Sequence, residues 1–203
     1  MAGPIWVESG PGGYVGVGTN YDVFGWSLSS TYTGVSISFP LVDWTVGGPI
    51  SGTEGIVYLM NQIGTGTTAA NEVATPVTVT GLSATVQNIT LFSGLTLGPG
   101  NYYLVFAQTT SLSMDLGESA SGLTETTGAG VTVLGQGGGT PTGLPPTGFP
   151  PDVNVSFNAP ESSGNQFSIT GDPSGATPEP TTAMMAMAGG AVLLAGLRRK
   201  RVR

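Results

Sequence analysis

The chain has 203 residues, of which 39% are hydrophobic and only 8% are charged, so it can bury a core beneath a weakly charged surface. It contains no Cys and no His, which excludes thiol chemistry, Ser-His-Asp triads, His-ligated zinc and disulfide bonds. All 12 acidic residues lie in residues 1–197, which have no Lys or Arg, and residues 198–203 hold all 5 basic residues. A body with a charge of −12 and no basic patch argues against nucleic-acid binding.

The composition favours short strands joined by turns, because 34 Gly and 15 Pro, with many Ser and Thr, disfavour helices. Patterns of alternating or dense apolar residues predict eight strands. They are expected at residues 35–39, 55–60, 77–80, 84–92, 101–107, 131–134, 153–157 and 166–170. This series predicts an all-β domain over residues 1–175, an antiparallel β-sandwich of jelly-roll type. A Gly-rich β-solenoid is the rival, and it is less favoured because no fixed repeat period is seen.

The stretch GQGGGTPTGLPPTGFPPD at residues 135–152 interrupts the predicted strands. Gly and Pro dominate it, so we expect a long loop without regular structure. Such a loop is either a mobile connection or a recognition loop, since long loops in compact domains are often functional.

Residues 176–203 form a tail of different character. A short linker leads to Pro178-Glu179-Pro180, and the residue before each proline is pushed to extended geometry. Residues 183–197 are 15 residues without a charge, and a helix of that length reaches about 22 Å of the roughly 30 Å bilayer core. We therefore expect a short, marginal transmembrane helix. The alternative is a buried core helix with a solvated basic end.

The basic residues follow this apolar run directly. They are Arg198, Arg199, Lys200, Arg201 and Arg203. Positive residues that flank a membrane segment stay on the cytoplasmic side, so the expected orientation places the carboxyl end inside and the body outside.

The tail resembles the PEP-CTERM sorting signal of exported proteins of Gram-negative bacteria. The resemblance rests on Pro178-Glu179-Pro180, Thr181, the apolar residues 183–197 and the basic cluster 198–201. It implies that Pro178, Glu179 and Pro180 are recognised by an exosortase, so that the protein is a substrate of that membrane enzyme and not itself a catalyst. It also implies export alongside exopolysaccharide, to the cell surface or the extracellular matrix, with no cofactor.

The body carries looser resemblances to the jelly-roll ectodomains of such proteins, at residues 97–105 and 166–171. Export requires a signal peptide, which has a basic start, an apolar stretch and a small-residue cleavage site. The start MAGPIWVESGPGGYVG has none of these, so we expect the true amino terminus to lie upstream of Met1.

Two roles for the body remain open: a structural or adhesive protein, or a carbohydrate-binding module. Trp6, Trp26 and Trp44, near Tyr21 and Tyr32, would serve the second role if they are exposed, although core packing is the simpler explanation. Carboxylate pairs that could hydrolyse glycosides would come from Glu54, Asp115, Glu118 and Glu125, but no spacing singles out a pair.

Two further patterns in the body are weak. Asp115 and Glu118 could ligate Ca²⁺, although an Asp/Asn-rich loop is lacking. Asn88 and Asn154 match the N-glycosylation pattern, but both lie within predicted strands.

Overall fold

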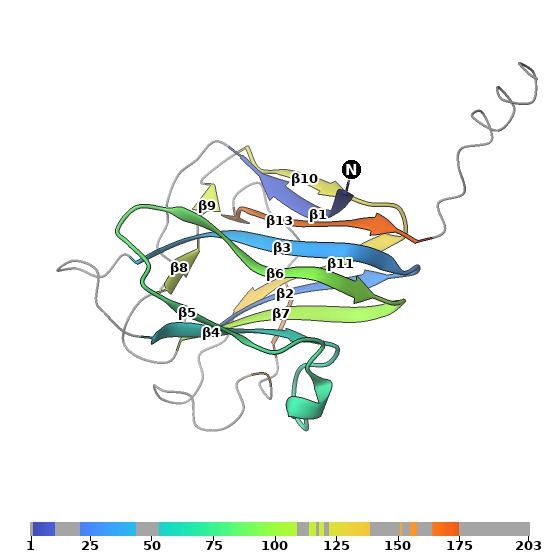
Figure 1. Cartoon of the computed structure of the whole chain (residues 1–203), viewed down its shortest axis with the longest axis horizontal. Coiled ribbons are helices and arrows are strands. Elements are labelled where there is room, and N and C mark those ends of the chain that lie inside the picture. The colour runs from blue at the N-terminus through green and yellow to red at the C-terminus, as the bar shows by residue number, and fades with distance from the viewer. Residues whose placement is uncertain are drawn as a thin grey trace, which may run out of the picture.

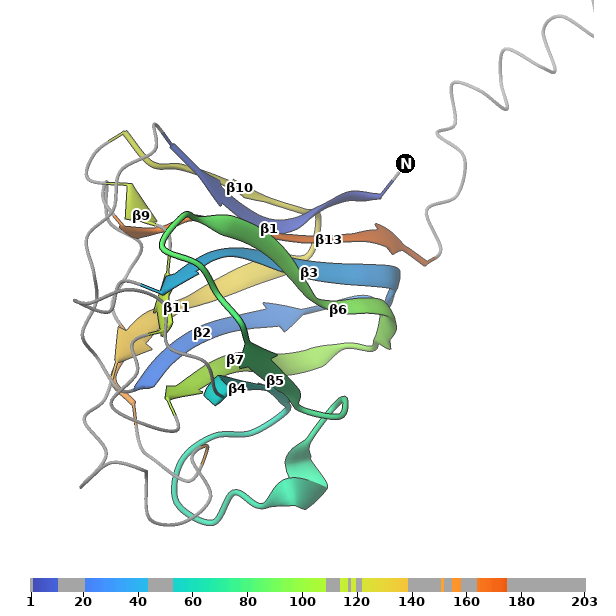
Figure 2. The ribbon, with the colours of Figure 1, turned by 60° about the vertical axis from the view of Figure 1, so that its left-hand side comes forward.

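The computed structural model describes residues 2–10, 21–43, 53–108, 114–116, 118–119, 122–138, 151, 155–157 and 164–174. These residues form two antiparallel β-sheets packed face to face, and Figures 1 and 2 show the two layers. The prediction of an all-β, sandwich-like domain is therefore confirmed.

The first sheet has the strand order β10-β1-β13-β3-β6, and β8 also pairs with β3. Its strands are β1 (Gly3–Ser9), β3 (Tyr32–Asp43), β6 (Gln87–Leu97), β8 (Met114–Leu116), β10 (Thr124–Thr127) and β13 (Phe167–Pro173). The carboxyl-terminal strand β13 lies in the middle of this sheet, hydrogen-bonded to β1 on one side and to β3 on the other.

The second sheet has the order β11-β2-β7-β4-β5. Its strands are β2 (Tyr21–Leu28), β4 (Thr53–Met60), β5 (Val77–Thr80), β7 (Gly100–Gln108) and β11 (Val131–Gly138). A two-stranded sheet pairs β9 (Glu118–Ser119) with β12 (Gly164–Asn165), and η1 (Ala69–Asn71) is a single 3₁₀ turn. No helix in the described ranges is long and apolar enough to cross a membrane, and the predicted segment 183–197 lies outside them.

Aromatic side chains from both sheets fill the space between the layers. Phe39 of β3 stacks on Phe167 of β13, with ring centroids 4.9 Å apart, and meets Phe24 of β2 at 5.0 Å and Phe106 of β7 at 4.8 Å. Burial of aromatic area supplies a large share of the hydrophobic stabilisation of such a core. Along each strand, alternate side chains point inward between the two sheets. These inward-facing side chains form the core, as expected for a sandwich.

The second sheet is apolar on its outer face as well. Val23, Val105 and Ala107 are buried there, in a cluster against which Val155 and Phe157 pack. Phe157 stacks on Tyr103 at 6.0 Å, and the Pro151 carbonyl accepts a 2.9 Å hydrogen bond from the Gly64 amide. Residues 151 and 155–157 thus cover part of this face.

Two sequence predictions fail in this region. The predicted loop 135–152 begins inside a strand, because β11 continues to Gly138. A side chain at Gly137 would overlap Val155 and the Ser156 carbonyl, so glycine in this strand permits close approach of the covering segment. Residues 155–157 of the predicted strand 153–157 belong to no strand, and residues 153–154 lie outside the described ranges.

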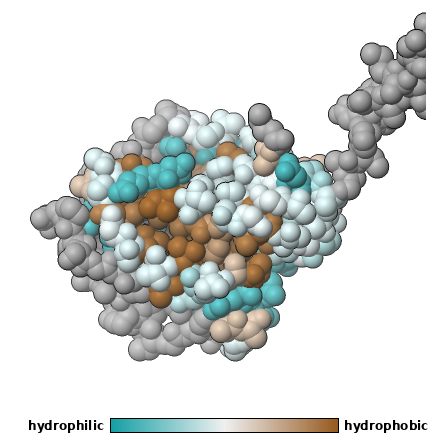
Figure 3. All heavy atoms as spheres, in the orientation of Figure 1, coloured by the Kyte–Doolittle hydropathy of each residue, from teal (hydrophilic) through white to brown (hydrophobic). Residues whose placement is uncertain are grey.

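The predicted strand 77–80 matches β5 at both ends, and the other predicted strands are confirmed with shifted ends, including 84–92, which corresponds to β6 at Gln87–Leu97. β1, β2, β8, β9, β10 and β12 were not predicted. The edge strands β6 and β5 lie on the face of the molecule seen in Figure 3, where apolar side chains reach the surface between them. Ile89, Leu95 and Val77 are among the partly buried residues there that pack against the core.

Candidate functional site

The tail leaves the domain at one end of the sandwich, which we call the exit end. It comprises the turns at residues 28–32, 97–100 and 128–131 together with residues 172–174. These segments adjoin one another because Tyr32 pairs with both Pro173 and Leu97, and Leu28 pairs with both Gly100 and Val131. In Figure 1 this is the right-hand end, where the orange strand β13 finishes.

The last described residue is tied to the domain. The Ser174 amide and hydroxyl both donate to the Thr31 carbonyl, at 2.8 and 3.1 Å. The triplet Pro178-Glu179-Pro180 begins four residues later, and the triplet and the basic residues 198–203 lie outside the described ranges. Four extended residues reach about 14 Å, which is the upper limit that the chain sets on the distance from Ser174 to the triplet.

Two buried tyrosines close the exit end with neutral hydrogen bonds. The Tyr32 hydroxyl donates to the Ala129 carbonyl at 2.8 Å, and the Tyr102 hydroxyl donates to the Gly98 carbonyl at 2.8 Å. Burial raises the pKa of both phenols above their ordinary value, so they stay uncharged at neutral pH. The polar groups that close this end thus carry no charge.

The structure overturns Trp6 and Trp26 as glycan contacts. Both are fully buried in the core, where Trp6 meets the edge of Phe167 at 4.7 Å and Trp26 stacks on Tyr102 at 5.9 Å. Their strands β1 and β2 point these rings inward between the sheets, so no surface ligand can contact them. Trp44 lies outside the described residues.

Of the four candidate carboxylates, Glu54 and Glu125 have described side chains, and they lie on different sheets. Glu54 is buried, and its Oε1 accepts a 2.9 Å hydrogen bond from the Leu82 amide. Burial raises the pKa of Glu54, and the nearby charge of Asp43 raises it further. Glu125 is exposed on β10. The backbones of Asp115 and Glu118 lie on β8 and β9, and their side chains are not described.

No group of three or more metal-ligating side chains occurs among the residues that the structure describes. Asn88 is exposed on β6, which is compatible with the glycosylation pattern, whereas Asn154 lies outside the described residues.

A polar network that sequence reasoning missed joins the two sheets. Gln136 of β11 donates through Nε2 to Oε2 of the buried Glu8 of β1 at 2.7 Å, and Asn165 donates through Nδ2 to Oε1 of Gln136 at 3.2 Å. The Trp6 indole N–H favours the charged form of Glu8 but does not meet hydrogen-bond geometry with it. The sequence did contain one signal for the burial of Glu8. Residues two apart in a strand lie on the same face, so Glu8 shares the inward face of Trp6.

Burial dominates the electrostatics of Glu8. Desolvation raises the pKa of this carboxyl from 4.5 to about 7, partly offset by the hydrogen bond from Gln136, and the charge of Glu125 adds to the rise. Glu8 Oε1 has no hydrogen-bond partner among the described residues. The network therefore combines a buried acid with an unsatisfied oxygen, in a body that contains no basic residue to pair with it.

Comparison with known proteins identifies the tail. Residues 176–201 match the family model of the PEP-CTERM protein-sorting motif. The chain carries a PEP-CTERM sorting motif. This motif implies export, processing by an exosortase and transient membrane anchoring through the carboxyl-terminal tail. No curated protein and no solved structure matches the chain.

Proposed function

We propose that the chain is an exported protein of the cell surface or extracellular matrix, in which the β-sandwich is the delivered domain and the tail is its address. The observation that carries this proposal is the PEP-CTERM match at residues 176–201, directly after a domain that is folded as far as Ser174. The delivered domain has a structural or adhesive role and no catalytic one.

The tail divides this work among three segments. The exosortase recognises an extended segment at Pro178, Glu179 and Pro180, because each proline holds the preceding residue extended. Residues 183–197 pause in the membrane as a short helix. Arg198, Arg199, Lys200, Arg201 and Arg203 hold the end on the cytoplasmic side by the positive-inside rule.

The strand order supports the jelly-roll part of the fold prediction. If β1 to β7 and β13 are numbered one to eight, the first sheet reads one-eight-three-six and the second reads two-seven-four-five. Successive strands then cross between the sheets, except β4 and β5, which pair within the second sheet, and this is the arrangement of a jelly roll with two Greek keys. The remaining strands extend the edges of these two sheets, and we propose this topology for the delivered domain.

We do not carry the carbohydrate-binding alternative forward. Its argument required exposed tryptophans, and Trp6 and Trp26 lie in the core. An exopolysaccharide partner then rests only on the resemblance of the tail.

The test is expression behind a secretory leader in a host that has an exosortase. The full chain should reach the surface or medium in shortened form, whereas the triple variant Pro178→Ala, Glu179→Ala, Pro180→Ala and the deletion of residues 176–203 should not be processed. The double variant Ser162→Ala, Ser163→Ala is the control, and it should behave as the full chain. Equal shortening of the full chain and the triplet variant would contradict recognition at the triplet.

A further inference from the structure

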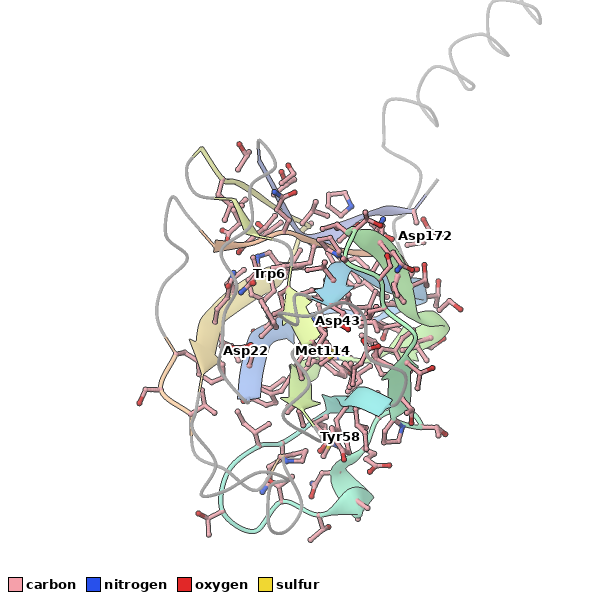
Figure 4. The ribbon with its side chains drawn as sticks, turned by 90° about the vertical axis from the view of Figure 1, so that its left-hand side faces the viewer. Trp6, Asp22, Asp43, Tyr58, Met114 and Asp172 are labelled. Atoms are coloured by element: carbon pink, nitrogen blue, oxygen red, sulfur yellow. The ribbon has the colours of Figure 1, made fainter. Side chains whose placement is uncertain are left out.

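The two ends of the sandwich differ in charge. The end opposite the exit end, which we call the far end, is defined by strand pairs such as Glu8 with Glu125, Asp22 with Gly138 and Asp43 with Met114. The acidic residues at strand positions of the far end are Glu8, Asp22, Asp43, Glu54, Asp115, Glu118 and Glu125. Burial raises the pKa of Glu8 and Glu54, so the negative charge of this end comes mainly from the other five. Figure 4 looks onto this end and shows Asp22 and Asp43 there.

The exit end has a different surface. Among its described residues Asp172 is the one carboxylate, and the turns consist of Ser, Thr, Gly, Pro and Ala, with apolar residues and the buried Tyr32 at their ends. Figure 3 shows mostly pale side chains, of intermediate hydropathy, on the right-hand side of the domain. Glu72 lies on the flank of the second sheet, bridged to Met60. The charge asymmetry therefore runs along the strands, with fewer carboxylates on the side where the chain continues into the tail.

Chain length limits how far the exit end can lie from a bilayer that holds the tail. From Ser174 to Ala183, where the apolar run begins, nine residues span at most about 30 Å. β3 is 12 residues long and so extends about 40 Å. The connection thus keeps the exit end near the membrane but does not fix which way the domain points.

We propose that, while the tail anchors the protein, the exit end faces the lipid headgroups of an anionic membrane and the far end points away. This inference rests on the anchoring role of the tail proposed above. A membrane with anionic lipids repels carboxylates within a Debye length, about 8 Å at physiological salt. Because residues 1–197 contain no basic residue, no patch attracts the bilayer, and repulsion of the far end sets the orientation.

The absence of cysteine permits a direct test. Asn101→Cys labels the exit end and Thr124→Cys labels the far end, both at exposed positions. Each full-length variant carries a donor dye and is reconstituted in phosphatidylcholine vesicles containing 25% phosphatidylglycerol and a headgroup-labelled acceptor. Energy transfer should be several-fold higher from position 101 than from position 124, and 1 M salt should reduce this difference. Equal transfer, or more from position 124, would overturn the orientation.

Vesicle flotation separates this inference from the proposed function. If the full chain does not float with the vesicles, the anchoring role fails and the orientation fails with it. If it floats and the two labels transfer equally, only the orientation fails. The chain lacking residues 176–203 is the control, and it should stay in the unbound fraction.

A second pair of variants tests the charge argument by itself. Asn101→Asp with Ala129→Asp adds two carboxylates to exposed positions of the exit end, and should raise energy transfer from a label at position 124. Thr78→Asp with Thr80→Asp adds the same charge to exposed positions of β5, and should not raise it. Circular dichroism confirms that both variants fold. If transfer is unchanged in the exit-end variant, charge does not set the orientation.

Discussion

The exit end and the far end of this sandwich are built from the same strands but satisfy their polar groups differently. At the exit end, the hydroxyls of Tyr32 and Tyr102 and both donors of Ser174 bond to backbone carbonyls. At the far end, Glu8 and Glu54 are buried, and each has one oxygen without a hydrogen-bond partner among the described residues. The end that leads into the sorting tail is thus closed by uncharged hydrogen bonds, while the opposite end holds most of the acidic residues at strand positions.

This difference predicts that the far end makes stability depend on pH near neutrality, because the described carboxyls with raised pKa values, Glu8 and Glu54, lie there. A buried carboxylate is normally stabilised by a cation, and residues 1–197 contain none. Glu8 and Glu54 both have raised pKa values, so each binds its proton more tightly in the folded state. Their contribution to the free energy of unfolding therefore falls as pH rises above the ordinary carboxyl pKa.

The largest expected loss of stability comes from substituting a core residue that belongs to neither end of the sandwich. Phe39→Ala removes a ring that meets Phe24, Phe106 and Phe167, and should lower the free energy of unfolding by about 3–5 kcal/mol. Urea denaturation at pH 5 and pH 8 should give the same loss. Leu95→Ala, at a half-buried rim position, is the control and should cost clearly less. A loss at Phe39 that varies with pH would show that the far end is not the main source of pH dependence.

Glu8→Gln should show most clearly that the pH dependence of the free energy of unfolding comes from the far end. Below pH 4.5 the carboxyl is protonated in both the folded and unfolded states, so the variant should match the parent. Between pH 4.5 and about 7 the unfolded state loses its proton first, so the parent loses stability and the variant does not. At pH 8 the variant should be more stable, on the order of 3 kcal/mol.

The matched control for Glu8→Gln is Asp172→Asn, which removes an exposed carboxylate from the exit end. Thermal unfolding measured across pH 4 to 9 should leave its difference from the parent nearly constant. A Glu8→Gln curve that runs parallel to the parent would contradict a buried, proton-binding Glu8.

Substitution of two glycines by alanine compares the packing on the covered outer face of the second sheet with the packing at the exit end. Gly137→Ala would overlap Val155 and the Ser156 carbonyl, and should cost about 1–3 kcal/mol. At the exit end, a methyl group added to Gly98 would meet no atom within 4 Å, and the φ of Gly98 is not positive. Gly98→Ala should therefore be neutral or stabilising by up to about 1 kcal/mol. Chemical denaturation of both variants, with unchanged circular dichroism, checks the contrast.

The smallest expected effect concerns the neutral closure of the exit end. Tyr32→Phe removes the hydrogen bond to the Ala129 carbonyl and should cost about 0.5–1.5 kcal/mol. Because this bond involves no charge at neutral pH, the loss should be equal at pH 5 and pH 8. A pH-dependent loss would show that the exit end shares the electrostatics of the far end.

Sequence patterns predicted the sandwich because strands such as 77–80 and 101–107 have apolar faces or dense apolar runs. They missed β10, whose residues TETT are all exposed on an edge, and β2, whose glycine and aromatics obscure the alternation. The polar link from Glu8 to Gln136 spans 128 positions in sequence, so only the fold brings it together. The tail was identified by its motif, because its three segments are contiguous in the chain.

The central claim is that residues 176–203 are a sorting signal for a folded domain. Its most direct test is intact-mass spectrometry of the protein recovered from the surface or medium of a host with an exosortase. We predict a chain that retains β13 through Pro173 and lacks the apolar and basic residues 183–203. Recovery of the full mass, with Arg203 still present, would contradict the account.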